Sequence, residues 1–165
     1  MSNKKTFDTN DCPHMLNWVI PHQVAVGDMD AAKMGPLLKK NNIHTIITVR
    51  GRLSQPPEYY KKHGIAVLHI PISDHELTNI GKYFPLVYNF IEQSLQNKKA
   101  VLVHCAAGIS RSTTLATSYL MRKYKLSATN ALKVIKKHRT CANPNSGFIR
   151  QLHDYEHVLK NHNLM

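Results

Sequence analysis

The chain has 165 residues, of which 42% are hydrophobic, and its 22 Lys and Arg outnumber its 10 Asp and Glu to give a formal net charge of +12. This length fits a single domain that buries roughly two thirds of the surface of its unfolded chain. No apolar run approaches the ~20 residues needed to cross a membrane, and the polar first residues lack the apolar core of a signal peptide. We therefore expect neither a membrane span nor a membrane partner.

The positive charge is scattered along the chain. Lysines occur as separate pairs, at residues 39–40, 61–62, 98–99 and 136–137, as is typical of solvated faces, and aromatic residues form no run that would stack on bases. Nucleic acid is therefore not the expected partner, although the charge is high. The same positive field would speed encounter with acidic, phosphorylated molecules.

Three cysteines are too few and too scattered for a disulfide framework: Cys12, Cys105 and Cys141. Their odd number favours a reducing compartment, so we expect an intracellular protein, cytoplasmic, nuclear or both. Whether Cys141 meets Cys105 as a redox partner depends on a distance that the sequence does not give.

The first half of the chain predicts alternating strands and helices. After a polar N-terminal arm over residues 1–20, hydrophobic periodicity predicts strands over residues 23–27, 45–49 and 66–70 and a helix over residues 30–40. Residues 51–57 are the densest cluster of turn formers and predict a surface loop.

A second helix is predicted over residues 79–95, where the apolar side chains share one helical face. Pro85 either breaks one hydrogen bond or marks a later helix start, and we expect a kink there. An apolar strand follows at residues 100–103. Three more helices are expected, from Ser112, from a Ser127 cap, and over residues 148–159. The fold class is therefore α/β.

The most informative stretch is residues 104–112, HCAAGISRS, between the last strand and the next helix. Backbone N–H groups of such a loop point at one spot, where the helix dipole favours an anion. Cys105 at this helix N-terminus, beside a guanidinium, is expected to be a nucleophilic thiolate. The Arg111 fork can hold two phosphate oxygens, and Gly108 permits positive φ and close approach. The expected phosphate-binding residues are Ala106, Ala107, Gly108, Ile109, Ser110 and Arg111.

A cysteine after a Val-rich strand is often only a small buried hydrophobe. The spacing favours chemistry, because packing alone rarely assembles a cysteine, a five-residue turn with a central Gly, an Arg and a hydroxyl residue between a strand and a helix.

These residues carry a family resemblance. The loop, together with residues 70–74 (IPISD) and 143–152 (NPNSGFIRQL), resembles the small atypical dual-specificity branch of the cysteine-dependent protein tyrosine phosphatases, from about residue 24 to 159. Within that branch the chain looks most similar to the phospho-Ser/Thr/Tyr-interacting pseudophosphatases, which lack the nucleophile. Cys105 stands where they carry a non-nucleophilic residue, so the chemistry indicates an enzyme.

The resemblance implies a dual-specificity phosphatase catalytic domain over residues 21–162. Its fold would be a central mixed, mostly parallel sheet of about five strands flanked by helices, with the phosphate-binding loop between a central strand and a helix. It implies no cofactor and no metal, and nothing in the sequence has zinc-ligand spacing.

A general acid is required to protonate the leaving oxygen. Asp74 is the best placed of the ten carboxylates, because it begins the loop that leaves the strand at residues 66–70. In the family the acid lies in this loop, roughly thirty residues before the cysteine. A turn or helix cap is the alternative role for Asp74, and Glu76 is the reserve acid.

Three further residues are expected to support the site. Ser112 suits an N-cap or first-turn position of the helix, and the resemblance adds that its hydroxyl bonds the cysteine sulfur and eases its departure. By resemblance His104 orients the loop and is not a base. Asn145 either caps the last helix, which we favour, or supports the floor of the active site.

The expected activity is hydrolysis of phosphotyrosine and of phosphoserine or phosphothreonine in proteins, through a cysteinyl phosphate. The chain leaves little room for the long loops that make classical relatives specific for phosphotyrosine. Alternatives are a phosphoprotein-binding module without turnover, and a phosphatase for RNA or phosphoinositides. The last commonly carries an extra basic residue in the loop, where this chain has Ala106, Ala107 and Ile109. The physiological substrate and the oligomeric state are not encoded in any motif we find.

Overall fold

The computed structural model describes Cys12 and residues 14–165. Residues 1–11 and 13 of the expected arm lie outside this range. The main elements, in chain order, are β1 (Leu16–Ile20), β2 (Val24–Gly27), α1 (Gly35–Lys40), β3 (Ile43–Thr48), α2 (Pro57–Lys62), β4 (Ala66–His69), α3 (Phe84–Gln96), β5 (Ala100–His104), α4 (Arg111–Tyr124), α5 (Ala128–His138) and α6 (Ser146–Asn161). Short 3-10 helices cover Ala31–Lys33 and Gly81–Tyr83.

The strands form one five-stranded sheet in the order β1-β2-β5-β3-β4. The pairs β2/β5, β5/β3 and β3/β4 are parallel, and only β1 runs antiparallel to its neighbour. This confirms the expected mixed, mostly parallel α/β fold. Because β5 lies in the middle of the sheet, the loop that follows it opens at the carboxyl edge, where ligands bind in such folds.

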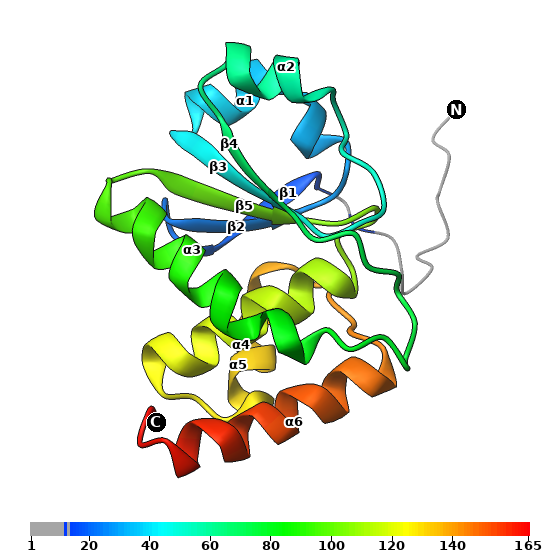
Figure 1. The fold of residues 1–165 in the computed structure, drawn as a ribbon, viewed down its shortest axis with the longest axis vertical. Coiled ribbons are helices and arrows are strands. Elements are labelled where there is room, and N and C mark those ends of the chain that lie inside the picture. Colours follow the sequence, from blue (N-terminus) through cyan, green and yellow to red (C-terminus); the bar gives the residue numbers. More distant parts are fainter. Residues whose placement is uncertain (1–11, 13) are drawn as a thin grey trace.

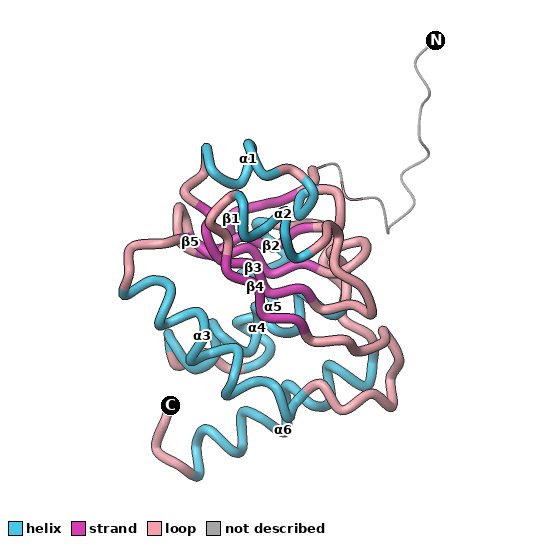
Figure 2. Tube along the Cα trace, turned by 45° about the horizontal axis from the view of Figure 1, so that its top comes forward, coloured by secondary structure: helices cyan, strands magenta, loops and turns pink. Residues whose placement is uncertain are grey.

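Helices cover both faces of the sheet (Figure 1), with α1 and α2 on one side and α3 to α6 on the other. The turned view in Figure 2 shows the same two layers. Successive strand residues point to opposite faces. In β5, Leu102 joins the core under α1 and α2, whereas Val101 and Val103 join the larger core under the other four helices.

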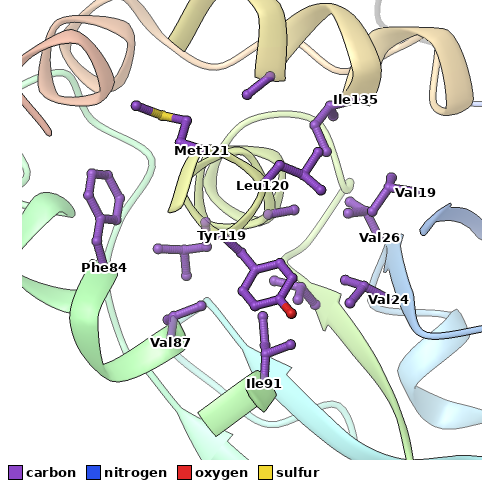
Figure 3. Packing of buried hydrophobic residues seen from close by; sticks show 14 of the residues in the cluster. Val19, Val24, Val26, Phe84, Val87, Ile91, Tyr119, Leu120, Met121 and Ile135 are labelled. Atoms are coloured by element: carbon purple, nitrogen blue, oxygen red, sulfur yellow. The ribbon is translucent and has the colours of Figure 1, made fainter. Parts of the chain in front are cut away.

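Helix α4 is the centre of the larger core. Figure 3 views it with side chains of α3, α5 and the sheet packed around Tyr119 and Leu120. Residues 112–121 are all buried, although several carry hydroxyls. The hydroxyls of Thr113, Thr114, Thr117 and Ser118 donate to backbone carbonyls three or four residues earlier, as Thr117 Oγ1 does to Thr113 O at 2.6 Å. The Ser112 hydroxyl pairs with the Cys105 sulfur and the Tyr119 hydroxyl donates to Glu92, so each of these buried hydroxyls has a partner. The core thereby fixes the N-terminus of α4, at which the candidate site lies.

Four local expectations need correction. Residues 16–20, assigned to the arm, form β1. The helix expected at residues 30–40 is a 3-10 turn followed by α1. Residues 57–62 form α2, for which no helix was expected after the loop at residues 51–57. Pro85 is the second residue of α3, where a missing N–H costs nothing, so the helix starts later than expected and the expected kink is wrong.

The scattered cysteines give no reason to expect a disulfide, and the sequence leaves the partner of Cys141 open. Cys12 and Cys141 form a disulfide with Cα atoms 5.2 Å apart, which ties Cys12, ahead of β1, to the segment after α5. Cys105 remains a free thiol, so the pairing of Cys141 is with Cys12 and not with the expected nucleophile. No local pattern marks this pair, because 129 residues separate the two cysteines.

We expect the disulfide to stabilise the fold, because it closes a very long loop in the unfolded chain. Cys141→Ser should lower the free energy of unfolding by about 2–5 kcal/mol in urea titrations without reductant. With a dithiol reductant present, wild type and variant should unfold at nearly the same urea concentration. Equal midpoints without reductant would show that the bond contributes no stability.

Candidate active site

The loop between β5 and α4 turns its carbonyl groups outward. Each carbonyl from Cys105 to Ser110 accepts a hydrogen bond from a donor outside the concave side of the loop. The pairs are Cys105 O with His104 Nδ1 (3.0 Å), Ala106 O with Met29 N (3.0 Å), Ala107 O with Arg139 Nη2 (3.3 Å), Gly108 O with Arg139 Nε (2.8 Å), Ile109 O with Asn143 N (2.8 Å) and Ser110 O with Thr114 N (3.0 Å).

The amide groups of the same loop face the other way, because carbonyl and N–H point in opposite directions across a planar trans peptide. The N–H groups of residues 106–110 donate to no group in the described part of the chain. A cluster of free N–H groups at the start of a helix is an anion site. The geometry therefore provides the cradle that the sequence predicted.

Gly108 is required at the apex of the loop. Its φ is +68°, and a Cβ there would lie 2.6 Å from the carbonyl oxygen of Gly27. Any side chain would thus strain the backbone and collide with the end of β2. The sequence expectation of a positive φ at this residue is confirmed.

Cys105 lies under the cradle with 2% of its surface exposed. Its sulfur is 3.2 Å from the hydroxyl oxygen of Ser112, which is itself fully buried at the start of α4. Ser112 is the second residue of α4, so its expected place in the first turn is confirmed, whereas the N-cap position belongs to Ser110. A hydroxyl so placed can donate to a thiolate.

Arg111 is held from one side only. Its Nη1 donates to the carbonyl of Ile72 at 3.0 Å, in the segment that leads from β4 to Asp74. Its buried Nε has no partner among the described residues. A partly buried guanidinium with an unused donor is suited to a phosphate oxygen.

Asp74 shares one pocket with Cys105, as the sequence predicted. The pocket has a volume of about 410 Å³ and is lined by Asp74, Cys105, Ala106, Ala107, Ile109, Ser110, Arg111, Asn143, Pro144 and Asn145. Asp74 is the one carboxylate in this lining. Glu76, the reserve acid, is absent from it and instead accepts from the Ser146 hydroxyl at 3.0 Å, where an acidic side chain complements the start of α6.

Asn145 connects three parts of the site. Its Nδ2 donates to Asp74 Oδ1 at 2.9 Å, and its backbone N–H donates to Ser110 Oγ at 3.0 Å. Its Oδ1 accepts from Phe148 N at 2.9 Å and so caps α6. The favoured capping role is confirmed, and the same side chain also orients the candidate acid.

The loop after Asp74 packs directly on α6 at Gly147. A Cβ on Gly147 would overlap the carbonyl group of Glu76. Only glycine permits this approach, which brings the loop of the candidate acid to the N-terminus of α6.

His104 is a buried, neutral support at the end of β5. Because a carbonyl only accepts, Nδ1 donates to Cys105 O, and the hydroxyl of Thr48 then donates to Nε2 at 2.8 Å. Burial lowers the pKa of His104 to about 4, against a weaker opposing effect of the Cys105 carbonyl. The neutral ring therefore orients the loop and cannot be a base for the reaction near neutral pH.

Sequence reasoning missed three residues of the site. Asn143 and Pro144 complete the pocket wall, and Asn143 N holds the Ile109 carbonyl. Arg139 holds two more loop carbonyls. In sequence it is one of many basic residues in a positive chain, so no local signal marked it.

Across Cys12 and residues 14–165, no three His, Cys, Asp or Glu side chains gather so that they could hold a metal ion. The same residues include no helix with the length and apolar character needed to cross a membrane.

The comparisons with known proteins agree with this geometry. The model of the family "Dual specificity phosphatase, catalytic domain" matches residues 26–158. The chain belongs to this family. It is 36% identical over 143 residues to human dual specificity protein phosphatase 9, covering 86% of this chain and 36% of that protein.

The chain is also similar to a mouse protein and to a solved crystal structure. The mouse serine/threonine/tyrosine-interacting protein is 36% identical over 126 residues, which cover 74% of this chain and 56% of that protein. The crystal structure of DUSP15 has a TM-score of 0.81 at 35% identity and covers 90% of this chain and 91% of that one. The chain thus spans 36% of the length of the human relative and 56% of the length of the mouse relative.

We expect the His104 ring to make stability depend on pH. Since its folded pKa of about 4 lies below the unfolded value of 6.5, the unfolded chain binds the proton first as the pH falls. Its contribution is complete above pH 6.5 and is lost between pH 6.5 and 4, by about 3 kcal/mol. Urea titrations of wild type and His104→Gln across this range should give curves that converge at low pH. Parallel curves would contradict a neutral buried ring.

Proposed function

We propose that this chain is a protein phosphatase that hydrolyses phosphotyrosine and phosphoserine or phosphothreonine through a cysteinyl phosphate. The observation that carries the proposal is the pocket itself. One cavity brings together the Cys105 sulfur, the inward N–H groups of its loop, an Arg111 side chain with an unused donor, and the Asp74 carboxylate.

In the first step the Cys105 thiolate attacks phosphorus. A sulfur–phosphorus bond forms as the ester oxygen–phosphorus bond breaks, and protonated Asp74 gives its proton to the leaving oxygen. The loop amides and Arg111 stabilise the charge on the equatorial oxygens of the phosphoryl group in transit. The products are the free hydroxyl of the substrate and phosphocysteine.

In the second step a water molecule gives its proton back to Asp74 and its oxygen attacks phosphorus. The sulfur–phosphorus bond breaks and inorganic phosphate leaves. The Ser112 hydroxyl, 3.2 Å from the sulfur, donates to the departing thiolate and lowers its basicity. The cycle restores both groups and uses no cofactor.

The substrates we propose are phosphorylated proteins in an intracellular location, cytoplasmic or nuclear. The free Cys105 supports such a compartment, because a nucleophilic thiolate works only while it is reduced. A disulfide such as Cys12–Cys141, by contrast, is rare there. The positive charge of the chain would draw in acidic phosphorylated segments. In the described part of the chain, no long loop deepens the pocket. This supports tolerance of both phosphotyrosine and the shorter phosphoserine.

A phosphate-dependent binding module is the second candidate, because the mouse relative is named an interacting protein. Such a module needs the cradle and Arg111 alone. The presence of a thiol under the cradle and of a carboxylate beside it favours turnover. Activity toward RNA or phosphoinositides has less support, since the loop offers Ala106, Ala107 and Ile109 where an added basic side chain would be expected.

The nucleophile and the acid can be tested together. We expect Cys105→Ser to abolish phosphate release from a doubly phosphorylated Thr/Tyr peptide between pH 5 and 8. Asp74→Asn should slow it roughly 10²- to 10⁴-fold and remove the basic limb of the pH profile. With an aryl phosphate whose leaving group needs no proton, the loss in Asp74→Asn should be much smaller. Phosphopeptide binding without any turnover by wild type would instead establish the binding module.

Asn145 separates its two roles in one substitution. Asn145→Ser keeps an N-cap for α6 but has no amide to reach Asp74, so the free energy of unfolding should stay within about 0.5 kcal/mol. We expect turnover of phosphopeptides to fall roughly tenfold, with little change for the aryl phosphate. Equal losses on both substrates would argue against a role through the acid.

A further inference from the structure

Arg139 is a buried cation immediately behind the phosphate-binding loop. It follows α5, and only 1% of its surface is exposed. Its Nε donates to Gly108 O at 2.8 Å and its Nη2 to Ala107 O at 3.3 Å. Its Nη1 donates to His14 O and Asn17 Oδ1, both at 2.9 Å.

All four of these acceptors are neutral. No carboxylate of the described residues lies within salt-bridge distance of Arg139, in contrast to the three exposed or partly exposed ion pairs of the structure. Burial lowers the pKa of Arg139, while the negative charges of Asp28 and Cys105 act in the opposite direction. A buried charge without an ion pair is costly, so the charge of Arg139 should strengthen the binding of an anion in the adjacent loop.

The two loop contacts of Arg139 also set the direction of two amides. Across a trans peptide, the carbonyl of Ala107 is opposite the N–H of Gly108, and the carbonyl of Gly108 is opposite the N–H of Ile109. Holding both carbonyls on the outer side therefore keeps both N–H groups on the concave side. The fork of a guanidinium is suited to this, because its donors are fixed in one plane.

We propose that Arg139 is a positioning residue for the phosphate-binding loop: it holds the amides of Gly108 and Ile109 toward the phosphate and places a positive charge behind them. The proposal rests on the proposed function of the loop as a phosphate site. Arg139 does not touch the substrate, and the loop lies between them.

Residues near the start of the described chain complete this arrangement. His14 and Asn17 supply the acceptors that hold Nη1, and Cys12 just before them is disulfide-bonded to Cys141, two residues beyond Arg139. His14 and the strand β1 are therefore part of the support of the loop, although they are far from it in sequence.

The test uses two readouts that need no turnover. The rate of Cys105 alkylation by iodoacetate is measured against pH, and inorganic phosphate is titrated to protect the thiol. In Arg139→Met we expect the midpoint of the alkylation profile to rise by about one pH unit and protection to need roughly tenfold more phosphate. Arg139→Lys should restore the midpoint but not the affinity, because it keeps the charge and loses the fork.

Lys137→Met is the matched control, since it removes the same charge from an exposed position in α5, two residues before Arg139, and should change neither readout. If Arg139→Met fails to fold, Asn17→Ala removes the acceptor in β1 and should weaken phosphate protection roughly two- to threefold. Thermal melts of every variant separate lost stability from lost positioning.

The proposal is overturned if a folded Arg139→Met variant keeps the wild-type midpoint and phosphate affinity, or if Lys137→Met shifts them equally. A merely structural role would lower the melting temperature and leave both readouts unchanged. Absence of turnover in wild type would contradict the proposed function alone, because alkylation and protection still report on the loop.

Discussion

The orientation of six consecutive carbonyl groups governs the candidate site. An anion cradle requires every N–H of the loop to face inward, and each peptide unit can turn over unless its carbonyl is held outside. The holding donors come from separate parts of the chain: Met29 after β2, Arg139 after α5, Asn143 before α6, and the first turn of α4. A seven-residue local motif therefore depends on contacts made by most of the domain.

The acid loop depends on the start of α6 in the same way. Asn145 uses its backbone N–H to hold Ser110 in the cradle, its Nδ2 to hold Asp74 and its Oδ1 to cap α6. Gly147 then allows the backbone of Glu76 to lie against the helix. Helix cap, cradle and acid are thus fixed by neighbouring residues of one segment, which explains how an exposed carboxylate can hold a defined place in the pocket.

Features with a local cause could be predicted from the sequence. The buried strand β5, the glycine at the apex of the loop and the Ser127 and Asn145 caps follow from short patterns. The pairing of Cys12 with Cys141 could not be predicted, because no local pattern shows that two residues 129 positions apart in sequence lie close together in the fold. The burial of Arg139 has no sequence signal either, because in a chain of net charge +12 nothing local separates one buried basic residue from the many exposed ones. The kink expected at Pro85 is wrong because the sequence does not show where the helix begins, and a proline in the first turn of a helix causes no kink.

The cradle alone does not distinguish an enzyme from a phosphate reader, since both need inward amides and a guanidinium. The discriminating contacts are those that serve bond breaking only. A reader gains nothing from a hydroxyl 3.2 Å from a thiol, or from an amide that aims a carboxylate at the mouth of the pocket, where negative charge would weaken phosphate binding. That carboxylate has a purpose if it is the general acid that gives a proton to the leaving oxygen as the ester breaks. The presence of both contacts beside one phosphate cradle is therefore the strongest structural argument for catalysis over binding.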